Sequence, residues 1–148
     1  MRTMTWNRAS LAGFVTAALC VVWLVLKGAI LGNGRVTIAI QAAAVALMVW
    51  ARMTFGGRSF HATANPTAGG LVTTGPYRYL RHPIYSALLY IIWAGIAAHL
   101  SLAHAIAAIL ATAGLAVRML AEETLLAGKY PEYTAYARRT RRVVPFLF

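Results

Sequence analysis

The sequence predicts an all-α integral membrane protein with four transmembrane helices and a C-terminal interfacial amphipathic helix. The first observation is composition: 60% of the 148 residues are hydrophobic and only 11% are charged, which is unlike an ordinary soluble domain. The second is arrangement, because the hydrophobic residues gather in four long runs and the arginines lie between and after them. We therefore expect residues 1–148 to form a single membrane domain.

The four apolar runs predict the spans in chain order. They lie at about residues 11–30, 36–52, 83–98 and 101–120. A spanning helix usually needs about 20 residues, so the last two are short and gain a turn from flanking residues. Gln41 interrupts the second run, and we expect it to hydrogen-bond to a neighbouring helix. His99 and His104 flank the third connection, but residues five apart do not share a helix face, so no metal site is expected.

The basic residues predict the orientation of the chain. Twelve of the fourteen lysines and arginines precede the first span, separate the second from the third, or follow the fourth. Lys27 and Arg35 lie on the opposite side. The positive-inside rule therefore predicts that both termini of this multi-pass protein are cytoplasmic. We expect the membrane to be a prokaryotic inner membrane. The same arginines form no stripe along a soluble face, so the net charge of +11 does not indicate nucleic-acid binding.

Two polar segments are expected on the cytoplasmic side. The loop over residues 54–81 contains glycine and proline breakers, and its part 54–75 is long enough to be either a lid over a site or a disordered linker. A final helix is predicted over residues 131–142, with Tyr133 and Tyr136 on one face. Its basic, amphipathic character is typical of a helix that lies on an anionic membrane surface.

Charged residues at the end of the fourth span form the first candidate site. Glu122 and Glu123 are two of the only three carboxylates in the chain, and Arg118 lies one helical turn before Glu122. A simple i,i+4 ion pair would contribute only about 0.2–0.5 kcal/mol. Ionisable groups near membrane depth cost more than that, so we interpret the cluster as a site for a charged ligand.

A second polar cluster, residues 75–85, precedes the third span. Pro83 suits the first turn of a helix, where free backbone N–H groups favour an anion. Arg81 and His82 add donors, although an interfacial belt of aromatic residues and arginines would have the same composition. Three tyrosines offer stacking faces: Tyr77, Tyr79 and Tyr85. If the two clusters meet, they suit a ligand with an ammonium, a carboxylate and an aromatic base, such as S-adenosylmethionine, although other zwitterions would also fit.

The same residues resemble a known family. The stretch from Leu71 to Tyr85, LVTTGPYRYLRHPIY, is similar to the signature of isoprenylcysteine carboxyl methyltransferases and their bacterial relatives. So is the later block with Arg118, Glu122, Glu123 and Leu126, which is followed by Tyr133, Tyr136, Arg139 and Pro145. The phospholipid N-methyltransferases share a looser version of this pattern.

The resemblance implies a role for each matching position. Arg118 would face the substrate carboxylate and act in catalysis. The pocket for S-adenosylmethionine would be lined by Leu71, Val72, Tyr77, His82, Pro83, Ile84, Tyr85, Glu122 and Glu123, with Gly69 and Gly70 beside them. The chain departs from the family pattern at Ala87, where glycine is common.

The sequence thus predicts an S-adenosylmethionine-dependent methyltransferase in the membrane. Its partners would be membrane lipids and a small lipophilic or prenylated substrate, and the expected methyl acceptor on that substrate is a carboxylate. One alternative is a NADPH-dependent membrane reductase of the sterol-reductase type, although those chains are longer and carry asparagine where Ile84 stands. The other is a non-enzymatic helical membrane subunit.

Overall fold

The computed structural model describes residues 2–56 and 70–144, and the side chains from residue 5 onward. These residues form helices and no named strand, so the predicted all-α class is confirmed. The elements in chain order are α1 (Arg2–Leu26), α2 (Arg35–Phe55), the 3₁₀ helix η2 (Gly75–Arg78), α3 (Pro83–Ala98), α4 (Leu102–Lys129) and α5 (Tyr133–Arg139).

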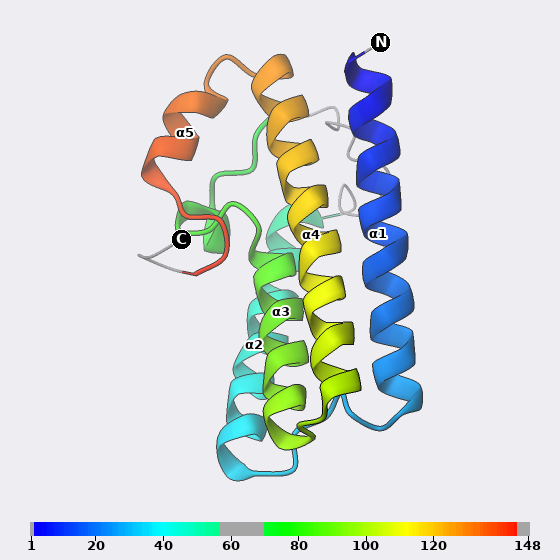
Figure 1. The fold of residues 1–148 in the computed structure, drawn as a ribbon. Coiled ribbons are helices and arrows are strands. Elements are labelled where there is room, and N and C mark those ends of the chain that lie inside the picture. The colour runs from blue at the N-terminus through cyan, green and yellow to red at the C-terminus, as the bar shows by residue number, and fades with distance from the viewer. Residues whose placement is uncertain (1, 57–69, 145–148) are drawn as a thin grey trace.

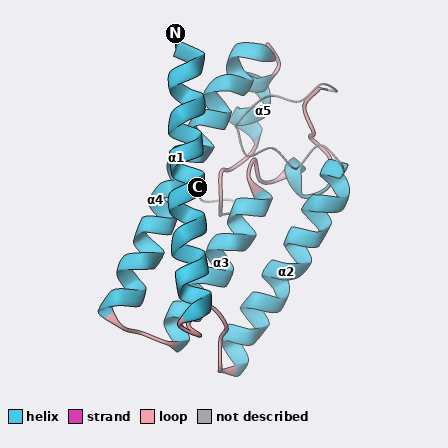
Figure 2. Ribbon diagram, turned by 90° about the vertical axis from the view of Figure 1, so that its right-hand side faces the viewer, coloured by secondary structure: helices cyan, strands magenta, loops and turns pink. Residues whose placement is uncertain are grey.

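The long helices form a bundle in the spatial order α2, α3, α4, α1. Helix α1 packs along α4, α2 packs along α3, and α3 and α4 are joined by a tight antiparallel hairpin (Figures 1 and 2). Helix α5 lies beside the upper part of α4, at the same end of the bundle as the beginning of α1 (Figure 1), and η2 packs against α2. The bundle therefore presents two different ends, and the small elements cap one of them.

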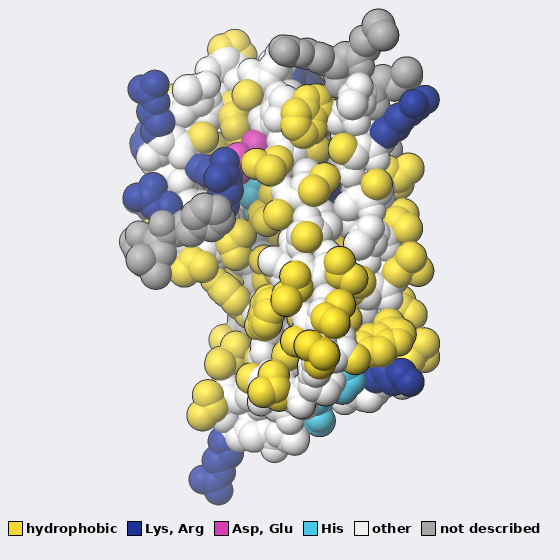
Figure 3. All heavy atoms as spheres, viewed as in Figure 1, with side chains coloured by type: hydrophobic (Ala, Val, Ile, Leu, Met, Phe, Trp, Pro, Cys, Tyr) yellow, Lys and Arg dark blue, Asp and Glu magenta, His cyan; other side chains and the backbone are white. Residues whose placement is uncertain are grey.

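Within the described residues, three helices are long and apolar enough to cross a membrane: α1 from Thr5, α2 and α4. Helix α3 is also apolar but has only 16 residues. At 1.5 Å per residue it is about 24 Å long, less than the roughly 30 Å of a hydrocarbon core. Large apolar side chains are exposed on the outer faces of the bundle, as a lipid-facing surface requires, among them Val22, Leu26, Ile38, Val49 and Ile109 (Figure 3).

The length difference between α3 and α4 positions the polar clusters. Because the hairpin aligns one end of each helix, α3 begins beside the middle of the 28-residue α4, near Arg118. Helix α4 then continues past the start of α3 to Lys129. The first residues of α3 therefore lie beside the charged residues of α4.

Small residues bring α1 and α4 into close contact. Gly13 of α1 and Gly114 of α4 face each other, and a Cβ atom added to either would collide with the carbonyl oxygen of the other. Between the other helices, the amide of Gln41 donates to the carbonyl oxygen of Ile91 on α3 at 2.9 Å and to that of Ile30 at 2.7 Å. The expected interhelical role of Gln41 is thus confirmed.

Helix bounds differ from the predicted ones at both ends of the chain. Helix α1 begins before residue 11 and ends at Leu26, because Gly28 adopts a positive φ of 67° and turns the chain. Helix α5 ends at Arg139, short of the predicted residue 142, because Arg141 pairs with Leu80 in an isolated parallel β-bridge. Residues 57–69 of the predicted loop 54–81, Gly69 included, and Pro145 lie outside the described residues.

Candidate functional site

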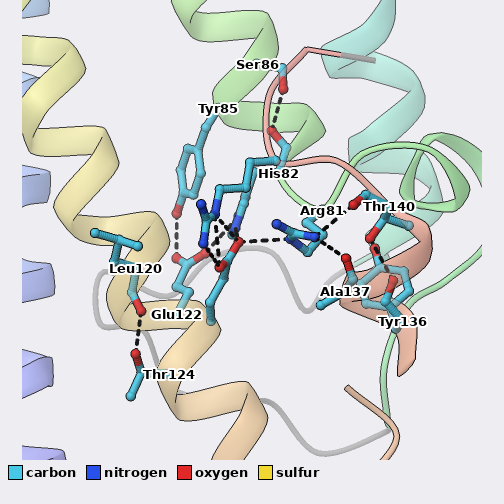
Figure 4. Close-up of polar contacts among 12 residues, drawn as sticks. Arg81, His82, Tyr85, Ser86, Leu120, Glu122, Thr124, Tyr136, Ala137 and Thr140 are labelled. Carbon is cyan, nitrogen blue, oxygen red and sulfur yellow. Dashed lines mark hydrogen bonds and ion pairs between the residues drawn. The ribbon is translucent and has the colours of Figure 1, made fainter. Parts of the chain in front are cut away.

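The two polar clusters meet where α3 begins beside α4, as predicted. The hydroxyl of Tyr85 donates to Glu122 Oε1 at 2.5 Å and accepts from Arg118 Nε at 2.5 Å. Arg118 Nε also lies 3.2 Å from Glu122 Oε1, so the i,i+4 ion pair is present with a tyrosine added to it. Figure 4 shows Tyr85 pointing from α3 toward Glu122 on α4.

The first turn of α3 sets the position of His82. Pro83 occupies the first helical position, and the backbone N–H and the hydroxyl of Ser86 both donate to the carbonyl oxygen of His82. The buried His82 ring stacks on Tyr85, with ring centroids 5.7 Å apart. Its Nε2 lies 3.1 Å from Glu123 Oε1 and its Nδ1 lies 3.7 Å from Glu122 Oε2. His82 therefore stands between the two carboxylates.

Glu123 is contacted by two arginines from different parts of the chain. Arg81 Nε lies 2.9 Å from its Oε1, and Arg142 contacts both carboxylate oxygens at 3.0–3.1 Å. The hydrogen bond to Glu123 is the main reason that the pKa of Arg142 is raised. The two carboxylates also differ in exposure: the Glu122 side chain is 22% exposed, whereas the Glu123 side chain is 13% exposed.

The end of α5 and the segment that follows it contact Arg81 on one side of the cluster. Arg81 donates to the carbonyl oxygens of Ala137 at 2.6 Å and Thr140 at 2.8 Å, and these contacts are drawn in Figure 4. The backbone N–H of Arg81 donates to the carbonyl oxygen of Arg141, and the backbone N–H of Arg141 donates to the carbonyl oxygen of Tyr79. The residues around Leu80 and those around Arg141 are therefore joined by both backbone and side-chain bonds.

Helix α1 supplies contacts that the sequence patterns did not predict. Arg118 is only 5% exposed, its Nη1 lies 3.4 Å from the hydroxyl of the fully buried Ser10, and its guanidinium carbon is 5.0 Å from the centroid of the Phe14 ring. The spacing of Ser10, Gly13 and Ala17 could have indicated this helix contact, because small residues three and four positions apart share one helix face. In the structure these three residues are buried and face α4.

The remaining predicted residues are buried to different degrees. Tyr77 of η2 is buried, its ring is 5.4 Å from that of Phe55, and its carbonyl oxygen accepts a 2.8 Å hydrogen bond from the hydroxyl of Tyr136. Burial raises the pKa of Tyr136 to about 12, so this hydroxyl stays a donor at neutral pH. Leu71 and Val72 are half-buried on the segment that leads to η2, and Ile84 is half-buried in the first turn of α3.

The fold and the site define a multi-pass helical membrane protein with a charged cluster at one end of its bundle. The family model described as Phospholipid methyltransferase matches residues 31–133, more than half of the chain. The chain therefore belongs to the phospholipid methyltransferase family and is a membrane methyltransferase. The matched region contains α2, α3 and α4, whereas α1 and the segment around Arg142 lie outside it. No curated protein and no solved structure matched the chain.

Proposed function

We propose that the protein transfers a methyl group from S-adenosylmethionine to a carboxylate on a small lipophilic molecule, as an isoprenylcysteine carboxyl methyltransferase does. The observation that carries this proposal is the geometry of Glu122. One of its oxygens is held by Tyr85 and Arg118, while the other lies 3.7 Å from Nδ1 of His82. Because the Glu122 side chain is 22% exposed, we assign this second oxygen to the ammonium group of the cofactor.

The residues around Glu122 fit the chemical groups of S-adenosylmethionine. A carboxylate suits its ammonium, and the first free N–H groups of α3 suit its carboxyl group. The aromatic rings of His82, Tyr85 and Tyr77 offer faces for the adenine and the sulfonium. When bound, the cofactor would supply a methyl group activated by the adjacent positive sulfur.

Arg118 supports a carboxylate as the methyl acceptor. A carboxylate is already ionised at neutral pH, so the protein needs to orient it rather than deprotonate it. The guanidinium of Arg118 is rigid and suited to hold a carboxylate, and Ser10 and Phe14 of α1 fix its position. In addition, Asn7 lies on α1 one turn before Ser10, and its buried Oδ1 has no hydrogen-bond partner among the described residues. It could accept a hydrogen bond from the substrate.

A phospholipid amine is the second candidate acceptor, because the matched family is named for phospholipid methylation. An amine must be neutral to attack, and the buried Arg118 offers it no base. A panel of lipophilic carboxylic acids and phosphatidylethanolamine, incubated with cofactor carrying a labelled methyl group, separates the two. Label in an ester that is released as methanol by mild base supports the carboxylate, whereas base-stable label in the phospholipid contradicts it.

The cofactor itself is tested by calorimetry on the detergent-purified protein. We expect S-adenosylhomocysteine to bind and NADPH not to bind, and we expect Glu122→Gln to abolish the binding. The matched control is Glu132→Gln, which changes the third carboxylate, an exposed residue before α5. Binding of NADPH would favour the reductase, binding of neither would favour a non-enzymatic subunit, and unchanged affinity in Glu122→Gln would refute the assigned site.

A further inference from the structure

The structure gives the two adjacent glutamates different surroundings. Both oxygens of Glu123 are occupied: Oε1 by Arg81, His82 and Arg142, and Oε2 by Arg142. An incoming ammonium would have to displace an arginine from a carboxylate that is 13% exposed. Because charged hydrogen bonds of this kind are among the stronger ones in proteins, such an exchange is unfavourable.

We propose that Glu123 does not hold the cofactor but is a positioning residue, which ties the C-terminal segment (residues 137–143) to the beginning of α3. The part of this inference that concerns the cofactor rests on the proposed function. The tie itself concerns only how the chain is held together.

Several contacts converge on this tie. Arg142 reaches Glu123 from the C-terminal segment, and Arg81 reaches it from the residue next to His82. Arg81 also donates to two carbonyl oxygens of the C-terminal segment. In addition, the hydroxyl of Tyr90 on α3 donates to the carbonyl oxygen of Val143 at 2.8 Å. Glu123 is the counter-charge shared by both arginines. Its neutralisation would leave Arg81, which is 11% exposed, and Arg142, which is 35% exposed, without their shared counter-charge, and would weaken the attachment of the segment.

His82 connects this tie to the proposed cofactor site. Its ring contacts Glu123 on one side, lies 3.7 Å from Glu122 on the other, and stacks on Tyr85. If Glu123 lost its contacts with the two arginines, it would no longer hold the His82 ring in place, and the ring would be free to move away from Glu122. The tie also includes Arg142, which lies beyond residue 133, where the family match ends. It therefore adds to the site a part of the chain that the matched region does not contain.

The tie is tested without any cofactor by the accessibility of Val143. This residue is 8% exposed and packs in a core cluster with Ala17, Leu115 and Met119. In a Cys20→Ala, Val143→Cys background, a maleimide should label the new thiol slowly. We expect Glu123→Gln to accelerate labelling by about tenfold or more, because the segment loses a charge-assisted attachment. The control Glu132→Gln should leave the labelling rate unchanged.

A second variant keeps the test valid if Glu123→Gln fails to fold. Arg142→Gln removes the link to the C-terminal segment but leaves Glu123 paired with Arg81 and His82, and it should also accelerate labelling. The double variant should label no faster than Glu123→Gln alone, since both changes break the same contact. Labelling at the rate of the parent in both single variants would overturn the tie.

Titration with S-adenosylhomocysteine then separates the two proposals. We expect Glu123→Gln to weaken binding by about tenfold, as a positioning residue would, whereas Glu122→Gln abolishes it. Complete loss of binding in Glu123→Gln together with unchanged labelling would make Glu123 a cofactor ligand and overturn the inference. If the unaltered protein binds no S-adenosylhomocysteine, the proposed function fails, but the labelling result still decides whether the tie exists.

Discussion

At the scale of single residues, Arg118 is a buried charge that contacts side chains from three helices. Its guanidinium contacts α1 through Ser10 and Phe14, α3 through Tyr85, and its own helix through Glu122. A cation enclosed in this way would be costly in a membrane protein without compensating partners. The proposed substrate carboxylate would be one more partner, and it would approach a group whose orientation is already set.

Arg118→Lys tests this role, because lysine keeps the charge but loses the planar fork. We expect affinity for S-adenosylhomocysteine to stay within about threefold of the unaltered protein, while methyl transfer to a prenylated cysteine probe falls by roughly 100-fold, since a misaligned acceptor reacts slowly. Calorimetry and labelled methyl transfer measure the two quantities. A loss of cofactor affinity as large as the loss of turnover would mean that Arg118 holds the cofactor site together instead.

At the scale of elements, the close approach of α1 and α4 brings Ser10 to Arg118. The contact depends on Gly13 and Gly114, whose missing side chains let the two backbones touch. Because Ser10 of α1 contacts Arg118 of α4, a change in the spacing of these two helices would alter the surroundings of Arg118.

Gly114→Ala and Gly128→Ala make the same substitution on the same helix with opposite expected effects. A Cβ at Gly114 would lie 2.5 Å from the carbonyl oxygen of Gly13, whereas a Cβ at Gly128 has open space around it. We expect Gly114→Ala to destabilise the protein by about 1–3 kcal/mol through overpacking. Gly128→Ala should be neutral or stabilise it by up to about 1 kcal/mol through helix propensity. Thermal unfolding in detergent measures both, and equal midpoints would show that α1 moves freely away from α4.

At the scale of the whole molecule, the two ends of the bundle differ in charge. Lys27 and Arg35 flank the connection between α1 and α2, at the end opposite to α5. The other basic residues that the structure describes lie in the first half of α1, in the last turn of α2, between η2 and α3, or from the second half of α4 onward, except Arg78, which ends η2. Figure 3 shows basic side chains gathered in the upper part of the molecule, near the acidic ones, with others at the lower end. This asymmetry supports the proposed orientation, with the site on the cytoplasmic side.

Reporter fusions at the C-terminus test that orientation in a bacterial inner membrane. We expect a green fluorescent reporter to be fluorescent and an alkaline phosphatase reporter to be inactive, because the positive-inside rule places this end in the cytoplasm. A fusion in the connection between α1 and α2 should give the reverse result. An active phosphatase at the C-terminus would place the charged site on the outer side, away from cytoplasmic S-adenosylmethionine.

The sequence by itself determined the helical class, the order of the spans and the pairing of Arg118 with Glu122. These follow from local patterns, since long apolar runs form helices in a membrane and residues four apart share a helix face. Its resemblance to methyltransferases also predicted that Tyr85 and Glu122 belong to one site, which the structure brings together.

Only the tertiary structure decided how Glu122 and Glu123 divide their contacts. Neighbouring helical residues point about 100° apart, so one carboxylate meets Tyr85 and Arg118 while the other meets Arg81 and Arg142. Arg81 and Arg142 are far apart in sequence, as are Ser10 and Arg118, and no local pattern states that they touch. Those contacts depend on how the hairpin aligns α3 with α4, on how closely α1 packs, and on where the chain returns after α5.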